Sequence, residues 1–185
     1  NPRGFFESKN HNDLLRTVFP GIYSETSPPP SIRELLELSK TNLNRYDEFI
    51  SCNYKENTTY CIKSPWSLSL PMWNAMEEKY DCKYIYISRN IDDQANSLMR
   101  IWKQHEERAV FANRDFLIPW LTEWGMFCKQ LLSHLNIRYH SVDFDELISD
   151  KVTTTNKIAS FTNCENIDNT AIDRWIIRNQ YNDQS

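Results

Sequence analysis

Two basic residues stand where predicted strands end. Lys63 closes the segment 59–63, just before Ser64-Pro65, and Arg89 directly follows the segment 83–88. In parallel α/β sheets, ligands bind beyond the carboxyl ends of the strands, where loops lead into helix N-termini. An ammonium and a guanidinium at neighbouring strand ends suit a di-anionic or poly-anionic ligand, because both donate charge-assisted hydrogen bonds. This placement therefore indicates an anion site.

Ser97 adds a hydroxyl to this cation pair. It lies eight residues after Arg89, inside a helix predicted to start near Asp92. At a rise of ~1.5 Å per residue it stands about 7 Å along the helix axis, a distance that an extended arginine also covers. The two side chains could therefore hold one phosphate group from two sides. On spacing alone, the alternative is favoured: Arg89 pairs with Asp92 or Asp93, and Ser97 is an ordinary helix residue.

Alternating strands and helices must position these residues. The clearest strand is 83–88 (KYIYIS), in which aromatic and β-branched residues precede a polar turn. Ser31, with Glu34 three residues later, predicts a capping box at the start of a helix over 31–50. Further strands are predicted over 59–63 and 137–142, and further helices over 7–19, 69–80, 92–105 (capped by Asn90 or Asp92), 115–135 (broken or kinked near Pro119), 144–148, 151–161 and 171–177.

This order of elements predicts the fold class. Strands separated by whole helices imply parallel pairing through right-handed crossovers, so the chain is expected to be α/β with helices covering the sheet. Neither an internal repeat nor a second domain is visible, and residues 1–185 are expected to form a single domain.

Composition excludes several classes of function. Three isolated glycines, Gly4, Gly21 and Gly125, cannot build GxGxxG or GxxxxGK[ST], so neither common phosphate loop lies within this chain. A net charge of −4 argues against non-specific nucleic-acid binding, although it leaves room for a local anion site. The sequence contains no apolar run that predicts a membrane span or a signal peptide. The five cysteines include no CxxC pair, which predicts small buried side chains in a reducing compartment and no metal site.

Four stretches resemble sulfotransferases, in the order that the family has them. Residues 84–97, a hydrophobic strand, Arg89, a turn and the helical Ser97, look like the segment that binds the nucleotide 3′-phosphate. Residues 1–7 (NPRGFFE) resemble the Asn-Pro-x-Gly-aromatic-Phe-Glu segment of bacterial-type members. Residues 62–65, with 70–73 behind them, resemble the Lys-x-Pro strand end, and 139–147 resemble the late strand with its aromatic-acid-acid-Leu turn. The resemblance covers about residues 1–165.

Two departures accompany the resemblance. The family usually has proline two positions after the arginine, where this chain has Ile91. The 5′-phosphosulfate loop of the family precedes everything that this chain matches, so we expect an N-terminally truncated domain that lacks this loop and its strand. Loss of a strand from within a sheet exposes apolar surface and backbone groups. Homodimerisation across that gap is accordingly a hypothesis.

The resemblance implies an activity and a set of site residues. The fold would be the P-loop-NTPase-like three-layer arrangement, and the reaction would move a sulfuryl group from 3′-phosphoadenosine 5′-phosphosulfate (PAPS) to a hydroxyl, with no metal. Arg89 and Ser97 would bind the 3′-phosphate, Lys63 would stabilise charge on the leaving phosphate, and Glu7 would be the general base. His105 and His140 are the other candidates for the base. Carbohydrate is the favoured acceptor, and the cytoplasm is the expected compartment.

Several alternatives remain open at this point. Lys63 could be a solvated strand-end lysine, and Glu7 a helix-start glutamate favoured by the helix dipole. Large aromatic residues could line an acceptor groove but are favoured as core and lid packing: Trp66, Trp102, Trp120 and Trp124. The chain could also be a non-catalytic module that binds an adenosine bisphosphate or a protein, or a relative of the P-loop kinases. A chain of this kind, without the phosphosulfate loop, could itself be inactive.

Overall fold

Two parallel strands lie at the centre of the molecule. The computed structural model describes residues 9–21, 26–53 and 67–163. In these residues β1 (Tyr84–Ser88) pairs with β2 (Tyr139–Asp143) in parallel, so that Tyr84 lies beside Tyr139 and Ser88 beside Asp143. The predicted strands over 83–88 and 137–142 and their parallel pairing are confirmed, while the predicted strand over 59–63 lies outside the described residues.

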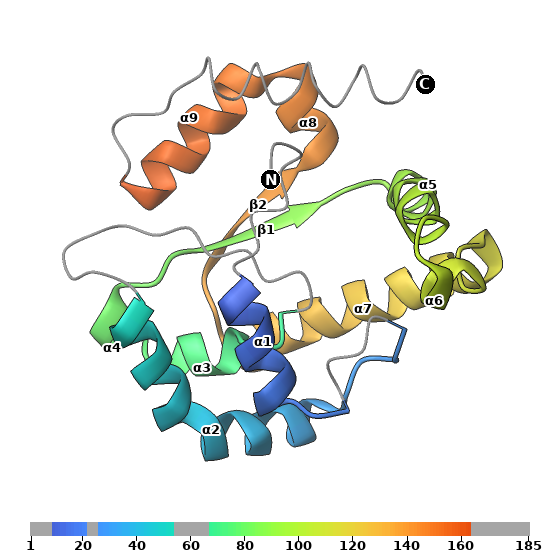
Figure 1. Cartoon of the computed structure of the whole chain (residues 1–185). Helices are drawn as coiled ribbons and strands as arrows, with labels where there is room; N and C mark the ends of the chain where they lie inside the picture. The colour runs from blue at the N-terminus through green and yellow to red at the C-terminus, as the bar shows by residue number, and fades with distance from the viewer. Residues whose placement is uncertain (1–8, 22–25, 54–66, 164–185) are drawn as a thin grey trace.

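Helices surround this sheet, as the α/β prediction requires. Figure 1 shows α8 and α9 on one side of the two strands and α1, α2, α3 and α7 on the other. The helices are α1 (Lys9–Val18), α2 (Ile32–Asn53), α3 (Leu70–Ala75), α4 (Glu77–Tyr80), α5 (Ile91–Trp102), α6 (Glu106–Ala109), α7 (Arg114–His134), α8 (Phe144–Ser149) and α9 (Lys151–Thr162).

Three helix predictions need correction. The segment 69–80 forms two short helices, because Met76 leaves the helical backbone conformation at φ −107° and ψ 10°. The helix predicted to reach residue 105 ends at Trp102, and α6 follows. The predicted break at Pro119 is wrong, since α7 continues through it. Proline removes one backbone hydrogen bond, whereas the surrounding turns bury Leu117 and Trp120, and burial of large apolar side chains outweighs that loss.

Side-chain caps set the starts of several helices, including α2 and α7. The Ser31 hydroxyl accepts a hydrogen bond from the Glu34 amide at 3.2 Å, which is the serine half of the predicted capping box. Asn113 caps α7 by accepting from the Phe116 amide at 2.9 Å. These interactions are local in sequence, which is why the start of α2 could be predicted from residue types alone.

The main core lies between α1, α2, α3, α5 and α7. Trp102, Trp120 and Trp124 are 3%, 5% and 5% exposed, so the expectation that they pack in the core is confirmed. Both Trp120 and Trp124 donate their indole N–H to the backbone carbonyl of Ser27, at 2.9 and 3.1 Å. Trp120 and Trp124 thereby satisfy their polar atoms within the core. Trp66 lies outside the described residues.

The prediction of buried cysteines is only partly right. Cys82 and Cys128 are half-buried thiols, and burial raises the pKa of each. Cys52 is exposed, because it lies two residues beyond the buried Ile50 and so points to the opposite face of α2. All three are free thiols.

Candidate functional site

The carboxyl ends of β1 and β2 lie side by side and lead into two helices. Ser88 and Asp143 are register partners, and the Ser88 hydroxyl lies 3.5 Å from a carboxylate oxygen of Asp143. The other carboxylate oxygen of Asp143 accepts from the amides of Asp145 and Glu146, at 2.8 and 3.2 Å, and so begins α8. The strand ends are therefore joined to each other and to the helix that follows.

A similar cap follows β1. The side-chain oxygen of Asn90 accepts from the amides of Asp92 and Asp93, at 2.9 and 3.4 Å, so Asn90 is the cap of α5. The side chain of Gln94 donates to the backbone carbonyl of Arg89 at 2.9 Å. These bonds fix the backbone of Arg89 between the end of β1 and the first turn of α5.

The side chain of Arg89 lies over an aromatic ring. Its guanidinium carbon is 4.7 Å from the centroid of the Phe144 ring. Its Nε atom is buried and has no hydrogen-bond partner among the described residues. An unpaired donor in such a place is costly unless an acceptor arrives, and a guanidinium pairs best with a carboxylate or a phosphate. Arg89 is thus a cation ready to receive an anion.

The alternative in which Asp92 neutralises Arg89 is wrong. Asp92 binds the guanidinium of Arg114 on α7, and Arg114 also donates to Asn96 at 3.0 Å. Within the described ranges, Arg89 forms no ion pair with Asp93 either. Asp92 is therefore directed toward α7, and no acid of the described residues neutralises the charge of Arg89.

Ser97 lies on the same side of α5 as the backbone of Arg89. Gln94, which reaches back to the Arg89 carbonyl, precedes Ser97 by three residues, and residues at that separation share a helix face. The helix starts at Ile91, one residue earlier than expected, which puts Ser97 about 9 Å along its axis. Ser97 is half-buried, and no hydrogen bond joins it to Arg89 in the part of the chain that the structure describes. Any joint grip on a ligand would therefore have to be made through that ligand.

Of the remaining predicted site residues, the two that the structure describes, His105 and His140, are not brought to Arg89. Lys63 and Glu7 lie outside the described residues. His105 is exposed at the position before α6. His140 faces α9, where its ring stacks on Phe161 with centroids 5.3 Å apart.

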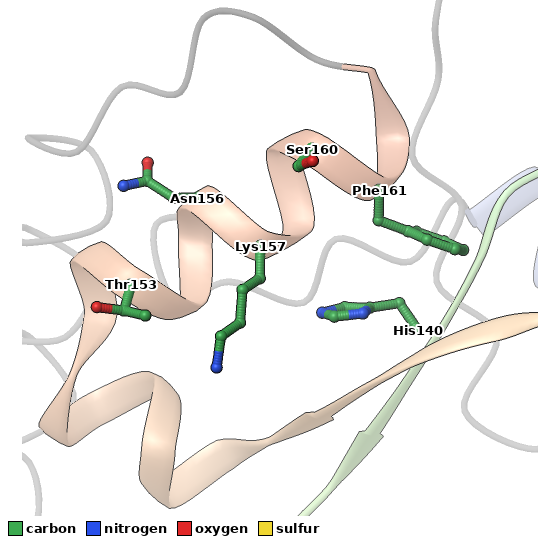
Figure 2. Close-up of a pocket in the computed structure, with 6 residues that line it drawn as sticks. All are labelled: His140, Thr153, Asn156, Lys157, Ser160 and Phe161. Atoms are coloured by element: carbon green, nitrogen blue, oxygen red, sulfur yellow. The ribbon is translucent and has the colours of Figure 1, made fainter.

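His140 belongs to a separate hollow, which Figure 2 shows between β2 and α9. The hollow has a volume of about 540 Å³ and is open to solvent. It is lined by His140, Thr153, Asn156, Lys157, Ser160 and Phe161. Because His140 lies three residues before the carboxyl end of β2, it is displaced from the strand ends where Arg89 stands. This position weakens its candidacy as the base.

The contact between Phe144 and Arg89 escaped the sequence analysis. The aromatic residue after the late strand is visible in the sequence, but nothing there pairs it with an arginine that follows another strand.

Residues 9–21, 26–53 and 67–163 contain no group of three or more His, Cys, Asp or Glu side chains arranged to hold a metal ion. No helix within these ranges has the length and apolar character to span a membrane.

One comparison with known proteins identifies a family. The family model described as the sulfotransferase domain matches residues 25–182. That range contains Lys63, Arg89, Ser97 and Phe144, whereas Glu7 precedes it. No curated protein and no solved structure matches the chain.

Proposed function

The chain belongs to the sulfotransferase family, and from this we propose that it binds PAPS with the 3′-phosphate at Arg89 and transfers its sulfuryl group to a hydroxyl. One observation carries the proposal: the guanidinium of Arg89 stands at the carboxyl end of β1 with a buried, unpartnered Nε and no carboxylate partner among the described residues. A half-buried cation in this state favours an anionic ligand, because the ligand supplies both the missing acceptor and the counter-charge.

Each of the proposed site residues has its own role in sulfuryl transfer. Arg89 would bind two phosphate oxygens with its fork, and the Ser97 hydroxyl would donate from the same side of α5. Lys63, at the end of the strand predicted over 59–63, would bind the oxygens of the leaving 5′-phosphate, where charge develops as the sulfur–oxygen bond breaks. The acceptor oxygen attacks the sulfur in line, and its proton passes to a base, for which we propose Glu7. Adenosine 3′,5′-bisphosphate leaves. As in phosphoryl transfer, placement and charge stabilisation would supply most of the rate enhancement.

The wider architecture and partners are part of the same proposal. We assign residues 1–185 to one sulfotransferase-like domain of the P-loop-NTPase-like, three-layer type, and the parallel pairing of β1 with β2 supports this assignment. Carbohydrate is the proposed acceptor.

The exposed side chains of β1 concern the oligomeric state. Ile85 and Ile87 are 37% and 58% exposed, which supports pairing of two chains along this strand. Light scattering should then find a dimer, and a monomer would refute that pairing.

Calorimetry tests the donor site. The chain should bind adenosine 3′,5′-bisphosphate, and Arg89→Ala should weaken this binding about 10- to 100-fold, which is the usual worth of hydrogen bonds to a charged group. Arg89→Lys keeps the charge but loses the fork, so it should recover only part of the affinity. Arg33→Ala is the matched control, because Arg33 is an exposed arginine paired with Glu37 on α2 and should leave binding unchanged.

Other ligands separate the competing functions. Tighter binding of magnesium–ATP than of the bisphosphate would favour a relative of the P-loop kinases. Equal bisphosphate binding by the protein and by Arg89→Ala would refute the proposed site. Transfer of labelled sulfuryl from PAPS to polysaccharide acceptors then distinguishes an enzyme from a binding module: binding without any transfer would leave the module as the function.

A further inference from the structure

The ring of Phe144 covers the guanidinium of the arginine to which we assign the phosphate. Phe144 is the first residue of α8 and directly follows β2, whereas Arg89 directly follows β1. The guanidinium carbon lies 4.7 Å from the centre of the ring, within the distance at which a cation is attracted to an aromatic face. Residues far apart in the sequence thus meet at the carboxyl edge of the sheet.

The position of the ring is set by the strand ends rather than by a free loop. The register of the sheet places Ser88 beside Asp143, so the residues that follow the two strands, Arg89 and Phe144, emerge at the same level. Asp143 then caps α8 through the amides of Asp145 and Glu146, which fixes the backbone on both sides of Phe144. The ring is therefore held in place before any ligand arrives.

The Phe144 ring affects the guanidinium of Arg89 differently from a carboxylate. A carboxylate would occupy the N–H groups of the guanidinium and cancel its charge. A ring carries no formal charge, so it attracts the guanidinium without cancelling its positive charge and without a carboxylate taking up its N–H groups. It also restricts a long side chain in advance, so less conformational freedom is lost when an anion binds. Arg89 is oriented in this way without being neutralised.

We propose that Phe144 is a positioning residue that holds the guanidinium of Arg89 ready to bind a phosphate group. This inference deepens the proposed function and rests on it for the identity of the anion, the nucleotide 3′-phosphate. The orienting contact itself does not depend on which anion binds. Phe144 would act through Arg89, and the experiments below separate this from a direct contact of the ring with the ligand.

Arginine side-chain NMR tests the orienting contact without any ligand. The Nε–Hε signal of Arg89, identified by its loss in Arg89→Lys, should be displaced by the ring current of Phe144 from the position of solvent-exposed arginines. Phe144→Leu, which keeps most of the volume, should return the signal toward that position, and Phe144→Tyr should not. Backbone amide spectra check that each variant is folded. An unchanged Arg89 signal in folded Phe144→Leu would overturn the proposal.

A double-mutant cycle tests the consequence for binding. Phe144→Leu should weaken binding of adenosine 3′,5′-bisphosphate about 3- to 10-fold, which corresponds to the usual strength of such a contact, and Phe144→Tyr should bind nearly as well as the parent. In the Arg89→Ala background, Phe144→Leu should cause no further loss. Phe161→Leu is the matched control, because Phe161 on α9 stacks on His140 and not on Arg89.

The outcomes distinguish the two proposals. An equal loss from Phe144→Leu with and without Arg89 means that the ring acts on the ligand directly, which overturns the positioning role. Parent-like binding by Phe144→Leu overturns it as well. If the parent protein binds no bisphosphate, the proposed function fails, and the NMR comparison alone then decides whether Phe144 orients Arg89.

Discussion

Replacement of Tyr46 by phenylalanine measures how much one buried hydroxyl contributes to the free energy of unfolding. Tyr46 on α2 is 0% exposed, and its hydroxyl lies 2.6 Å from Nε2 of His11 on α1, which is itself 1% exposed. The ring also contacts Trp73 edge-on with centroids 5.4 Å apart, and phenylalanine keeps that contact. The substitution therefore removes the hydrogen bond to His11 while the packing of the ring stays in place.

The expected cost follows from the burial of both partners. The net contribution of an intramolecular hydrogen bond to the free energy of unfolding is about 0.5–1.5 kcal/mol, and the loss of one between two buried side chains should cost about that much. For a domain of this size, that loss lowers the melting temperature by about 2–4 °C for each kcal/mol. Urea unfolding gives the free energy directly, and the slope with urea should not change, because the native and unfolded surfaces stay the same.

A second tyrosine supplies the control. Tyr139 is 40% exposed and also makes an edge contact with a ring, that of Tyr86. Tyr139→Phe is the same chemical change at the surface and should alter the free energy of unfolding by less than about 0.5 kcal/mol. If Tyr46→Phe costs no more than Tyr139→Phe, the hydrogen bond does not hold α1 on α2, and the reasoning is refuted.

Two further predictions concern charge and thiol chemistry. The hydrogen bond from Lys79 holds the pKa of Asp47 below its ordinary value of 3.8, so the contribution of this contact is present above pH 3.8 and is lost as the pH falls through the lower folded-state pKa. Urea unfolding between pH 2 and pH 7 should therefore show an acid loss that is smaller in Asp47→Asn, and identical profiles would contradict the assignment. Cys52 should react with a thiol reagent well before Cys128, because Cys52 is exposed whereas burial raises the pKa of Cys128 and keeps it protonated. Mass spectrometry of the labelled peptides gives the order, and faster labelling of Cys128 would contradict it.

The parts of the fold that the sequence predicted depend on short-range patterns. The segment before Arg89 alternates aromatic and β-branched residues, and this pattern alone predicts β1. Ser31 and Glu34 predict the start of α2, because a cap involves residues only three apart. Periodicity alone could not reveal the division of 69–80 into α3 and α4 or the continuity of α7 through Pro119. Both depend on packing against other elements, which outweighs local preference.

The candidate site likewise combines features that local sequence patterns predict with features that depend on tertiary packing. Residue types and spacing by themselves determined that a cation ends β1 and that Ser97 follows within the next helix, and they predicted the family that the domain match confirms. Only the tertiary structure decided the partner of Arg89. The register of two strands that are distant in sequence brings Phe144, rather than Asp92, to its guanidinium. Register is a property of the folded sheet, since a shift by one residue would turn each side chain to the other face.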